Sequence, residues 1–114
     1  MSLLNFLFGN SSINENTVLL SPEEFKQHIS KNKIQLIDVR TPREFHSSHI
    51  KGARNIDFYS GSFASEFNKL NKNKPVYIYC RTGSRSRHAS NKLSGMGFTE
   101  IFDLYGGIVR WKLS

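Results

Sequence analysis

The sequence predicts an α/β domain built around a mainly parallel sheet. Short runs of apolar and β-branched residues alternate with segments of helical spacing, and this alternation is typical of sheets whose strands are joined by helices. Two of the runs, residues 34–39 and 76–79, are apolar almost throughout, as in strands that are covered on both faces. The length of 114 residues suits one domain and is too short for two.

The first sixteen residues differ from the rest of the chain. An apolar stretch, residues 1–9, is followed by a polar linker, residues 10–16, and the domain is expected over residues 17–114. The apolar stretch has the spacing of one helical stripe, which favours a short docked helix, with a membrane-surface contact as the alternative. It lacks the basic region and cleavage site of a signal peptide, so we expect a cytoplasmic protein. No segment reaches the ~20 apolar residues of a membrane span.

The first half of the domain contains three expected strands and two expected helices. Residues 17–20 read as a first strand. The sequences SPEE at 21–24 and TPRE at 41–44 each supply a capping hydroxyl, a proline at the first helical position and a glutamate that closes a capping box. Each therefore begins a helix. The strand at 34–39 lies between these helices, and a small strand follows at 53–56.

The second half repeats the alternation of helices and strands. The expected elements are, in order, a helix with Phe63, Phe67 and Leu70 on one face, a turn at 72–75, the strand at 76–79, a helix over about 86–96, a strand at 101–103 and, after a turn at 105–107, a final helical segment with Ile108 and Trp111. Glycines at 95 and 97 end the longest helix, because glycine is common where helices terminate.

Cysteine usage and charge narrow the range of functions. Cys80 is the single cysteine, which excludes an internal disulfide, a cysteine-rich zinc site and a two-cysteine redox motif, and we expect neither metal nor cofactor. The formal net charge is +7, but the lysines are scattered and no RNA-binding aromatic motif occurs, which argues against nucleic acid. The densest basic cluster, Arg81, Arg85 and Arg87, starts directly after Cys80 and favours a small anion.

Cys80 stands where a parallel sheet binds its ligands, beyond the carboxyl end of the strand 76–79. The short polar loop 81–85 contains a glycine and can turn backbone N–H groups inward, and the helix that follows adds the positive end of its dipole. These groups favour a thiolate over a thiol and would stabilise negative charge on a bound group. The hydroxyls of Thr82 and Ser84 are candidate donors to a sulfur oxyanion. An inert buried cysteine is the alternative.

Four blocks of this sequence resemble the rhodanese-like domain family in its single-domain form. They are IDVR at 37–40 followed by Glu44 and Phe45, HIKGARNI at 49–56, YCRTGSRS at 79–86, and the pair Gly106 and Gly107 with Trp111. One block alone is weak, whereas four in order at suitable spacing are specific. The resemblance covers nearly all of residues 17–111. Ser48 and Lys51 stand where the family often has glycine and proline, which affects a turn and leaves the chemistry unchanged.

The resemblance implies a three-layer fold with a five-stranded, mainly parallel sheet flanked by helices. It also implies a sulfurtransferase of the thiosulfate sulfurtransferase type. Cys80 would take sulfane sulfur from a small anionic donor such as thiosulfate, hold it as a persulfide, and pass it to a thiol or protein acceptor. The loop that binds the substrate would consist of Arg81, Thr82, Gly83, Ser84, Arg85 and Ser86.

Asp38 and Arg40 are the predicted supporting residues, since they end the strand 34–39 near the same edge of the sheet. We expect Asp38 to hold loop backbone by hydrogen bonds. For Arg40 we expect an ion pair or cap with Glu44 and no catalytic part. The protein is expected to be a monomer.

Loop length favours sulfur transfer over phosphate chemistry. Cysteine phosphatases of similar architecture have five residues between cysteine and arginine, whereas four lie between Cys80 and Arg85, and Ser86 takes the position of the phosphatase arginine. The smaller loop suits one sulfur atom better than a phosphate. No Asp or Glu occurs between Glu66 and Glu100 to act as a general acid. A non-catalytic interaction or sulfur-sensing module stays open, as does, less favoured, a phosphatase or arsenate reductase.

Overall fold

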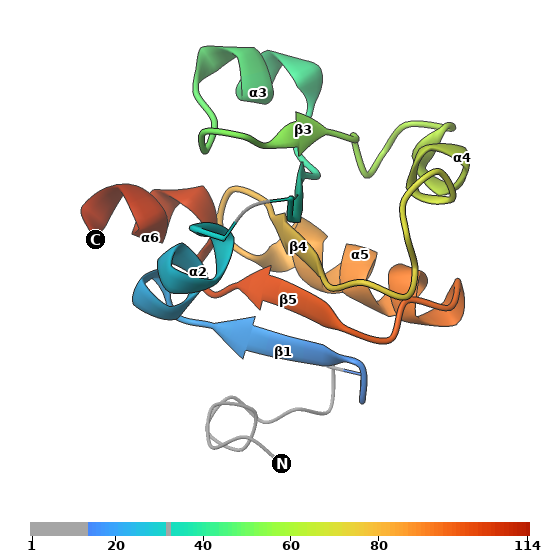
Figure 1. The fold of residues 1–114 in the computed structure, drawn as a ribbon. Helices are drawn as coiled ribbons and strands as arrows, with labels where there is room; N and C mark the ends of the chain where they lie inside the picture. Colours follow the sequence, from blue (N-terminus) through green and yellow to red (C-terminus); the bar gives the residue numbers. More distant parts are fainter. Residues whose placement is uncertain (1–13, 32) are drawn as a thin grey trace.

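A five-stranded sheet organises the protein (Figure 1). The computed structural model describes residues 14–31 and 33–114. All neighbouring strands are parallel, in the order β1-β5-β4-β2-β3. Their bounds are β1 Thr17–Leu20, β2 Gln35–Asp38, β3 Arg54–Asn55, β4 Val76–Tyr79 and β5 Ile101–Leu104. The predicted five-stranded parallel sheet is confirmed, and β4 lies at its centre.

Among the described residues, four helices connect the strands and a fifth follows β5, and the two predicted capping boxes are both present. The helices are α2 Pro22–Ile29, α3 Pro42–Ser47, α4 Phe63–Phe67, α5 Ser84–Gly95 and α6 Gly107–Leu113. Ser21 caps α2 and Thr41 caps α3, each with a glutamate three residues later. The predicted start of the longest helix near residue 86 is wrong. Gly83 is the N-cap and has a φ of 113°, a left-handed conformation that glycine adopts readily. This conformation turns the backbone directly into the helix, and α5 begins at Ser84.

Side chains alternate between two cores, one on each face of the sheet. Ile78 and Cys80 face α4 and α5, where they pack with Phe67 and Leu93. The two tyrosines of β4 face the other way, toward α2 and α6, together with Phe25 and Ile108. In Figure 1, α5 lies behind the sheet and α2 and α6 lie in front of it. Helices cover both faces, which explains why the central strands are apolar on both sides.

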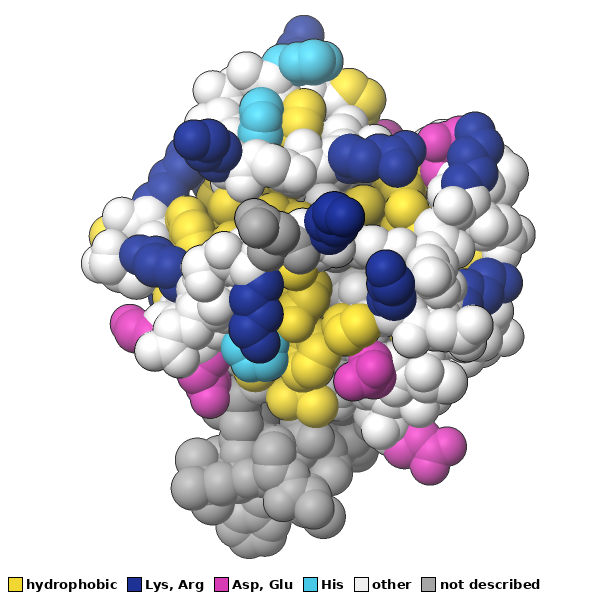
Figure 2. All heavy atoms as spheres, in the orientation of Figure 1, with side chains coloured by type: hydrophobic (Ala, Val, Ile, Leu, Met, Phe, Trp, Pro, Cys, Tyr) yellow, Lys and Arg dark blue, Asp and Glu magenta, His cyan; other side chains and the backbone are white. Residues whose placement is uncertain are grey.

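The predicted N-terminal apolar stretch lies outside the described residues. Of the predicted linker, residues 14–16 are described, and Asn14 and Asn16 contact α5. The Asn14 side-chain amide donates to the backbone oxygen of Ser90, and that of Asn16 donates to Ser94 Oγ. The domain boundary at residue 17 stays a prediction. Within the described ranges, no helix has the length and apolar character needed to cross a membrane. Figure 2 shows Lys and Arg side chains dispersed over one face of the molecule.

Candidate active site

The Cys80 sulfur lies at the carboxyl end of the central strand, beneath the first turn of α5. Cys80 is buried, and its Sγ accepts a hydrogen bond from the Gly83 backbone N–H at 3.0 Å. Ser86 Oγ lies 3.5 Å from the same sulfur. The first N–H groups of a helix have no acceptor within the helix and carry the positive end of its dipole. The site therefore presents hydrogen-bond donors and positive potential to the sulfur.

The first turn of α6, which follows Gly106, supports the backbone of the Cys80 loop. Ile108 N–H donates to the Cys80 carbonyl at 2.9 Å, and Val109 N–H donates to the Arg81 carbonyl at 3.1 Å. Gly107 makes this approach possible, because a Cβ there would lie 2.3 Å from the Arg81 oxygen. Its φ of +66° also favours glycine. Residues directly after the glycine pair of the fourth sequence block thus hold the third block in place.

Arg85 is bound to Glu44 and does not stand free beside the cysteine. Its two terminal nitrogens donate to the two carboxylate oxygens at 2.6 and 3.0 Å. The hydrogen bond from Arg85 holds the pKa of Glu44 well below its usual range, at about 2. The same contact raises the pKa of Arg85. The ion pair joins the first turn of α5 to α3.

The predicted pairing of Arg40 with Glu44 is wrong, because Arg40 binds Asp38. Arg40 Nη2 lies 2.7 Å from Asp38 Oδ2, and the Arg40 backbone N–H donates to Asp38 Oδ1 at 2.8 Å. Side chains two residues apart in an extended chain point to the same face, which brings these two together. The hydrogen bond from the Arg40 backbone N–H to the Asp38 side chain agrees with the expectation that Asp38 holds loop backbone.

Asp38 and Arg40 lie at the same edge of the sheet as Cys80 but on its opposite face. Both are buried with Tyr79, whose ring lies against the Arg40 guanidinium. Burial raises the pKa of Tyr79. Arg40 Nη2 also donates to the Ser48 carbonyl at 2.6 Å. The cluster fixes the segment that carries Glu44, so its support of the site is indirect.

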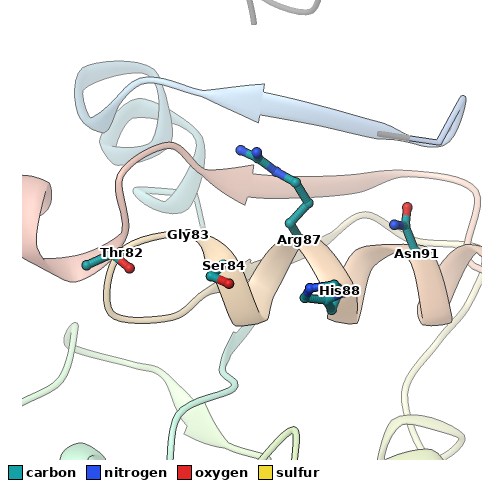
Figure 3. Close-up of a pocket in the computed structure, with 6 residues that line it drawn as sticks. All are labelled: Thr82, Gly83, Ser84, Arg87, His88 and Asn91. Atoms are coloured by element: carbon teal, nitrogen blue, oxygen red, sulfur yellow. The ribbon is translucent and has the colours of Figure 1, made fainter. Parts of the chain in front are cut away.

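Residues of the loop line two cavities. Thr82, Gly83 and Ser84 line one of about 430 Å³, together with Arg87, His88 and Asn91 (Figure 3). Arg81 lines another of about 410 Å³, whose cationic residues also include Arg40, Arg43 and Lys112. Of the two arginines that flank Cys80 in sequence, Arg81 is thus the exposed one. A small anion would meet Arg81 and the loop hydroxyls first.

One buried acid near the cysteine was not predicted from the sequence. Asp103 lies on β5 and is 1% exposed. Burial raises the pKa of Asp103 to about 7. The sequence did carry a signal, since an acid inside a strand covered on both faces is unusual. Within the described ranges, no three His, Cys, Asp or Glu side chains gather as a metal ion would need.

The fold and the site together define an α/β domain with a cysteine loop at the carboxyl edge of a parallel sheet. Residues 21–114 match the family model described as Rhodanese-like domain. The chain belongs to the rhodanese-like domain family.

Relatives of the chain include proteins named for sulfur transfer. It is 44% identical to the uncharacterized protein YqhL of Bacillus subtilis, over 81% of this chain and 70% of that protein. It is 30% identical to the thiosulfate sulfurtransferase GlpE of Pseudomonas aeruginosa, with 82% of each covered. The putative sulfur carrier protein YrkF of Bacillus subtilis is 32% identical, and the match spans about half of its length.

Solved structures show the same fold. The crystal structure of a rhodanese-like domain protein from Staphylococcus aureus superimposes with a TM-score of 0.72 at 28% identity, covering 82% of this chain and 89% of that one. The three-layer arrangement predicted from the resemblance is therefore confirmed.

Proposed function

We propose that this protein is a sulfurtransferase of the thiosulfate sulfurtransferase type that carries sulfane sulfur on Cys80. The observation that carries the proposal is the environment of the sulfur, which accepts the Gly83 N–H at the N-terminus of α5. Donors directed at a sulfur stabilise the thiolate, which is the reactive form, and they can equally stabilise a persulfide anion. The relatives named for sulfur transfer support the same reaction class.

The first half-reaction forms a persulfide. The Cys80 thiolate attacks the sulfane sulfur of thiosulfate, a new S–S bond forms, and the S–S bond of the donor breaks. Sulfite leaves with the electron pair of that bond. Arg81, Thr82 and Ser84 are the exposed side chains of the loop and would meet the anionic donor first. Arg85 takes a different part, because its charge is directed to Glu44.

The second half-reaction needs an acceptor from outside the chain. Cys80 is the only cysteine, so no second thiol of the chain can attack the persulfide. An acceptor thiolate, a protein thiolate or cyanide attacks the outer sulfur, and the Cys80 thiolate leaves. A covalent intermediate that separates two substrates gives ping-pong kinetics. We keep a cytoplasmic monomer as part of this proposal, and light scattering behind a sizing column tests the oligomeric state.

Intact mass measurement after incubation with thiosulfate tests the persulfide. The wild type should gain one sulfur atom, and Cys80→Ser should gain none. Addition of cyanide should return the wild type to its original mass, and double-reciprocal plots against thiosulfate at several cyanide concentrations should be parallel. A wild type that folds and gains no sulfur from thiosulfate contradicts the proposal and leaves the interaction module as the better account.

A phosphatase is not favoured by the geometry. Phosphate loops of cysteine enzymes use their arginine to bind the oxygens of the substrate. Here Arg85, one of the two arginines of the loop, has both terminal nitrogens on Glu44. Turnover of a generic aryl phosphate at a rate that depends on Cys80 would reverse this assignment.

A further inference from the structure

The cavity of about 410 Å³ beside the Cys80 loop carries positive charge that its own acid does not balance. Three exposed cations line it from α3, the loop and α6, namely Arg43, Arg81 and Lys112. Within residues 14–31 and 33–114, none of the three forms an ion pair. Glu44 also lines the cavity, but its carboxylate is bound by Arg85. The cavity is therefore suited to an anion that comes from outside the chain.

Arg40 lines the same cavity with a side chain that is 6% exposed. It donates through Nε and Nη2 to Asp38 and through Nη2 to the Ser48 carbonyl. None of these hydrogen bonds to the described residues uses Nη1, the other terminal nitrogen. Buried polar groups normally have a hydrogen-bond partner, and a guanidinium binds carboxylate oxygens strongly. An anionic oxygen in the cavity would supply the missing acceptor.

Ser48 holds two of the cations at the cavity. Its carbonyl accepts from Arg40 Nη2 at 2.6 Å, and its Oγ accepts from Lys112 Nζ at 2.7 Å. The second contact joins α6 to α3, since Ser48 is the C-cap of α3. These side chains are therefore held in place before a ligand arrives, which lowers the entropic cost of binding.

The cavity adjoins the cysteine loop and has an apolar side. Ile108 and Val109 line it, and their backbone N–H groups donate to the carbonyls of Cys80 and Arg81. Val109 is 42% exposed. Its volume is in the range of pockets that take a drug-sized ligand, which is far more than one small inorganic anion occupies. A polypeptide segment with carboxylate side chains would use both the cations and the apolar surface.

We propose that this cavity is the docking site for an acidic segment of a protein that accepts sulfur from Cys80. Carboxylates of the segment pair with Arg43, Lys112 and Arg40 Nη1, and the segment brings its own cysteine to the loop. The acceptor thiolate then attacks the outer sulfur of the Cys80 persulfide. The S–S bond breaks, and its electron pair stays on the Cys80 sulfur. The transfer step rests on the proposed function, whereas the binding step does not.

Binding is tested first, without any sulfur chemistry. The probe is a fluorescently labelled peptide in which a serine is flanked on both sides by glutamates, and the comparison peptide has glutamines in place of the glutamates. Fluorescence anisotropy with the wild type should show at least about tenfold tighter binding of the acidic peptide. This preference should shrink as the salt concentration rises, because salt screens exposed charges.

Two double variants with the same change of net charge locate the binding site. Arg43→Ala combined with Lys112→Ala should weaken binding of the acidic peptide about tenfold. Ser48→Ala, which keeps every charge and releases Lys112, should weaken it about threefold. The matched control is Lys31→Ala combined with Lys74→Ala. Both lysines are exposed and precede β2 and β4, at the edge of the sheet opposite to Cys80, so this variant should bind like the wild type.

Transfer is tested with the same peptides carrying cysteine in place of serine. Protein loaded with thiosulfate and freed of the donor is mixed with peptide, and intact mass follows the loss of one sulfur atom. The rate constant for the acidic peptide is divided by that for cyanide with the same protein, which removes any general effect on Cys80. This ratio should fall about tenfold in the variant that lacks Arg43 and Lys112, and it should stay at the wild-type value in the lysine control.

Equal binding of the two peptides by the wild type, or an equal effect of the two double variants on binding or on the rate ratio, overturns the proposal. Displacement of the acidic peptide by sulfate at constant ionic strength would assign the cavity to a small inorganic anion and overturns it as well. A protein that gains no sulfur from thiosulfate contradicts the proposed function, and the anisotropy measurements then decide the docking site alone.

Discussion

Arg81 and Arg85 are neighbours of the same cysteine in sequence, yet their charges have different surroundings. Arg85 is bound on two oxygens by Glu44, whereas Arg81 is exposed at a cavity with other cations. We predict that Arg81→Ala raises the KM for thiosulfate about fivefold, the effect of losing roughly 1 kcal/mol of charge attraction. Initial rates at several salt concentrations measure this, and the effect should shrink as salt increases.

The matched controls for Arg81→Ala are two other arginines. Arg85→Ala should change KM less than Arg81→Ala does, and Arg54→Ala, at an exposed arginine on β3, should leave KM unchanged. A larger KM effect at Arg85 would mean that its pairing with Glu44 opens when the donor binds.

The ion pair between Glu44 and Arg85 also predicts a dependence of stability on pH. The folded-state pKa of Glu44 is about 2, below its ordinary 4.5, so its contribution is present above about pH 4.5 and is lost as the pH falls toward 2. Glu44→Gln should lower the free energy of unfolding in urea at pH 7 by about 1 kcal/mol. The difference in the free energy of unfolding between wild type and Glu44→Gln should narrow as the pH falls from 4.5 to 3. A deficit that is independent of pH would assign the loss to packing.

For Asp103 we predict the opposite dependence, a contribution to folding stability that falls as the pH rises. Its pKa is about 7 when folded and 3.8 ordinarily, so the folded state holds a proton that the unfolded chain has released between these values. Its contribution to stability is therefore lost as the pH rises through this window. Asp103→Asn should be more stable than the wild type at pH 8, by about 1–3 kcal/mol, and equal to it near pH 4. A variant that is less stable at pH 8 would show that the carboxylate is well paired when folded.

At the scale of elements, the close approach of α6 to the Cys80 loop leaves no room for a side chain at Gly107. A methyl group there would collide with the Arg81 carbonyl, so the loop or α6 must move. We predict that Gly107→Ala lowers kcat/KM for sulfur transfer at least about tenfold and lowers the melting temperature. Gly95→Ala is the control, because a Cβ at Gly95 meets nothing within 4 Å. Wild-type rates in Gly107→Ala would show that the loop tolerates the displacement.

The elements that local signals specify were predicted from the sequence. The capping boxes at Ser21 and Thr41 and the apolar strands depend on residues a few positions apart, and they are where the patterns place them. The early start of α5 was missed because it depends on the left-handed conformation of Gly83. The contact of Glu44 with Arg85 joins residues 41 positions apart, and only the folded sheet brings these together.

At the scale of the whole molecule, the site is assembled from segments that follow three parallel strands. The segment after β2 carries Glu44, the segment after β4 carries Cys80 and its loop, and the segment after β5 carries the glycine pair. Parallel strands all end at one edge, which is where α/β folds place their sites. The resemblance singled out the loop 81–86 as a unit, whereas the pairing of Arg85 with Glu44 and the burial of Asp103 depend on the relative positions of strands distant in sequence.

The pairing of β1 with β5 has a consequence for synthesis on the ribosome. Parallel strands cannot form hairpins, so none of these strands pairs with the strand made directly before it through a tight turn. The first strand to emerge, with its buried leucines Leu19 and Leu20, has its partner in the last strand to be made. Until residues 101–104 are translated, this apolar segment has no place in the sheet. In a nascent chain, we therefore expect β1 to stay unpaired until β5 has been made.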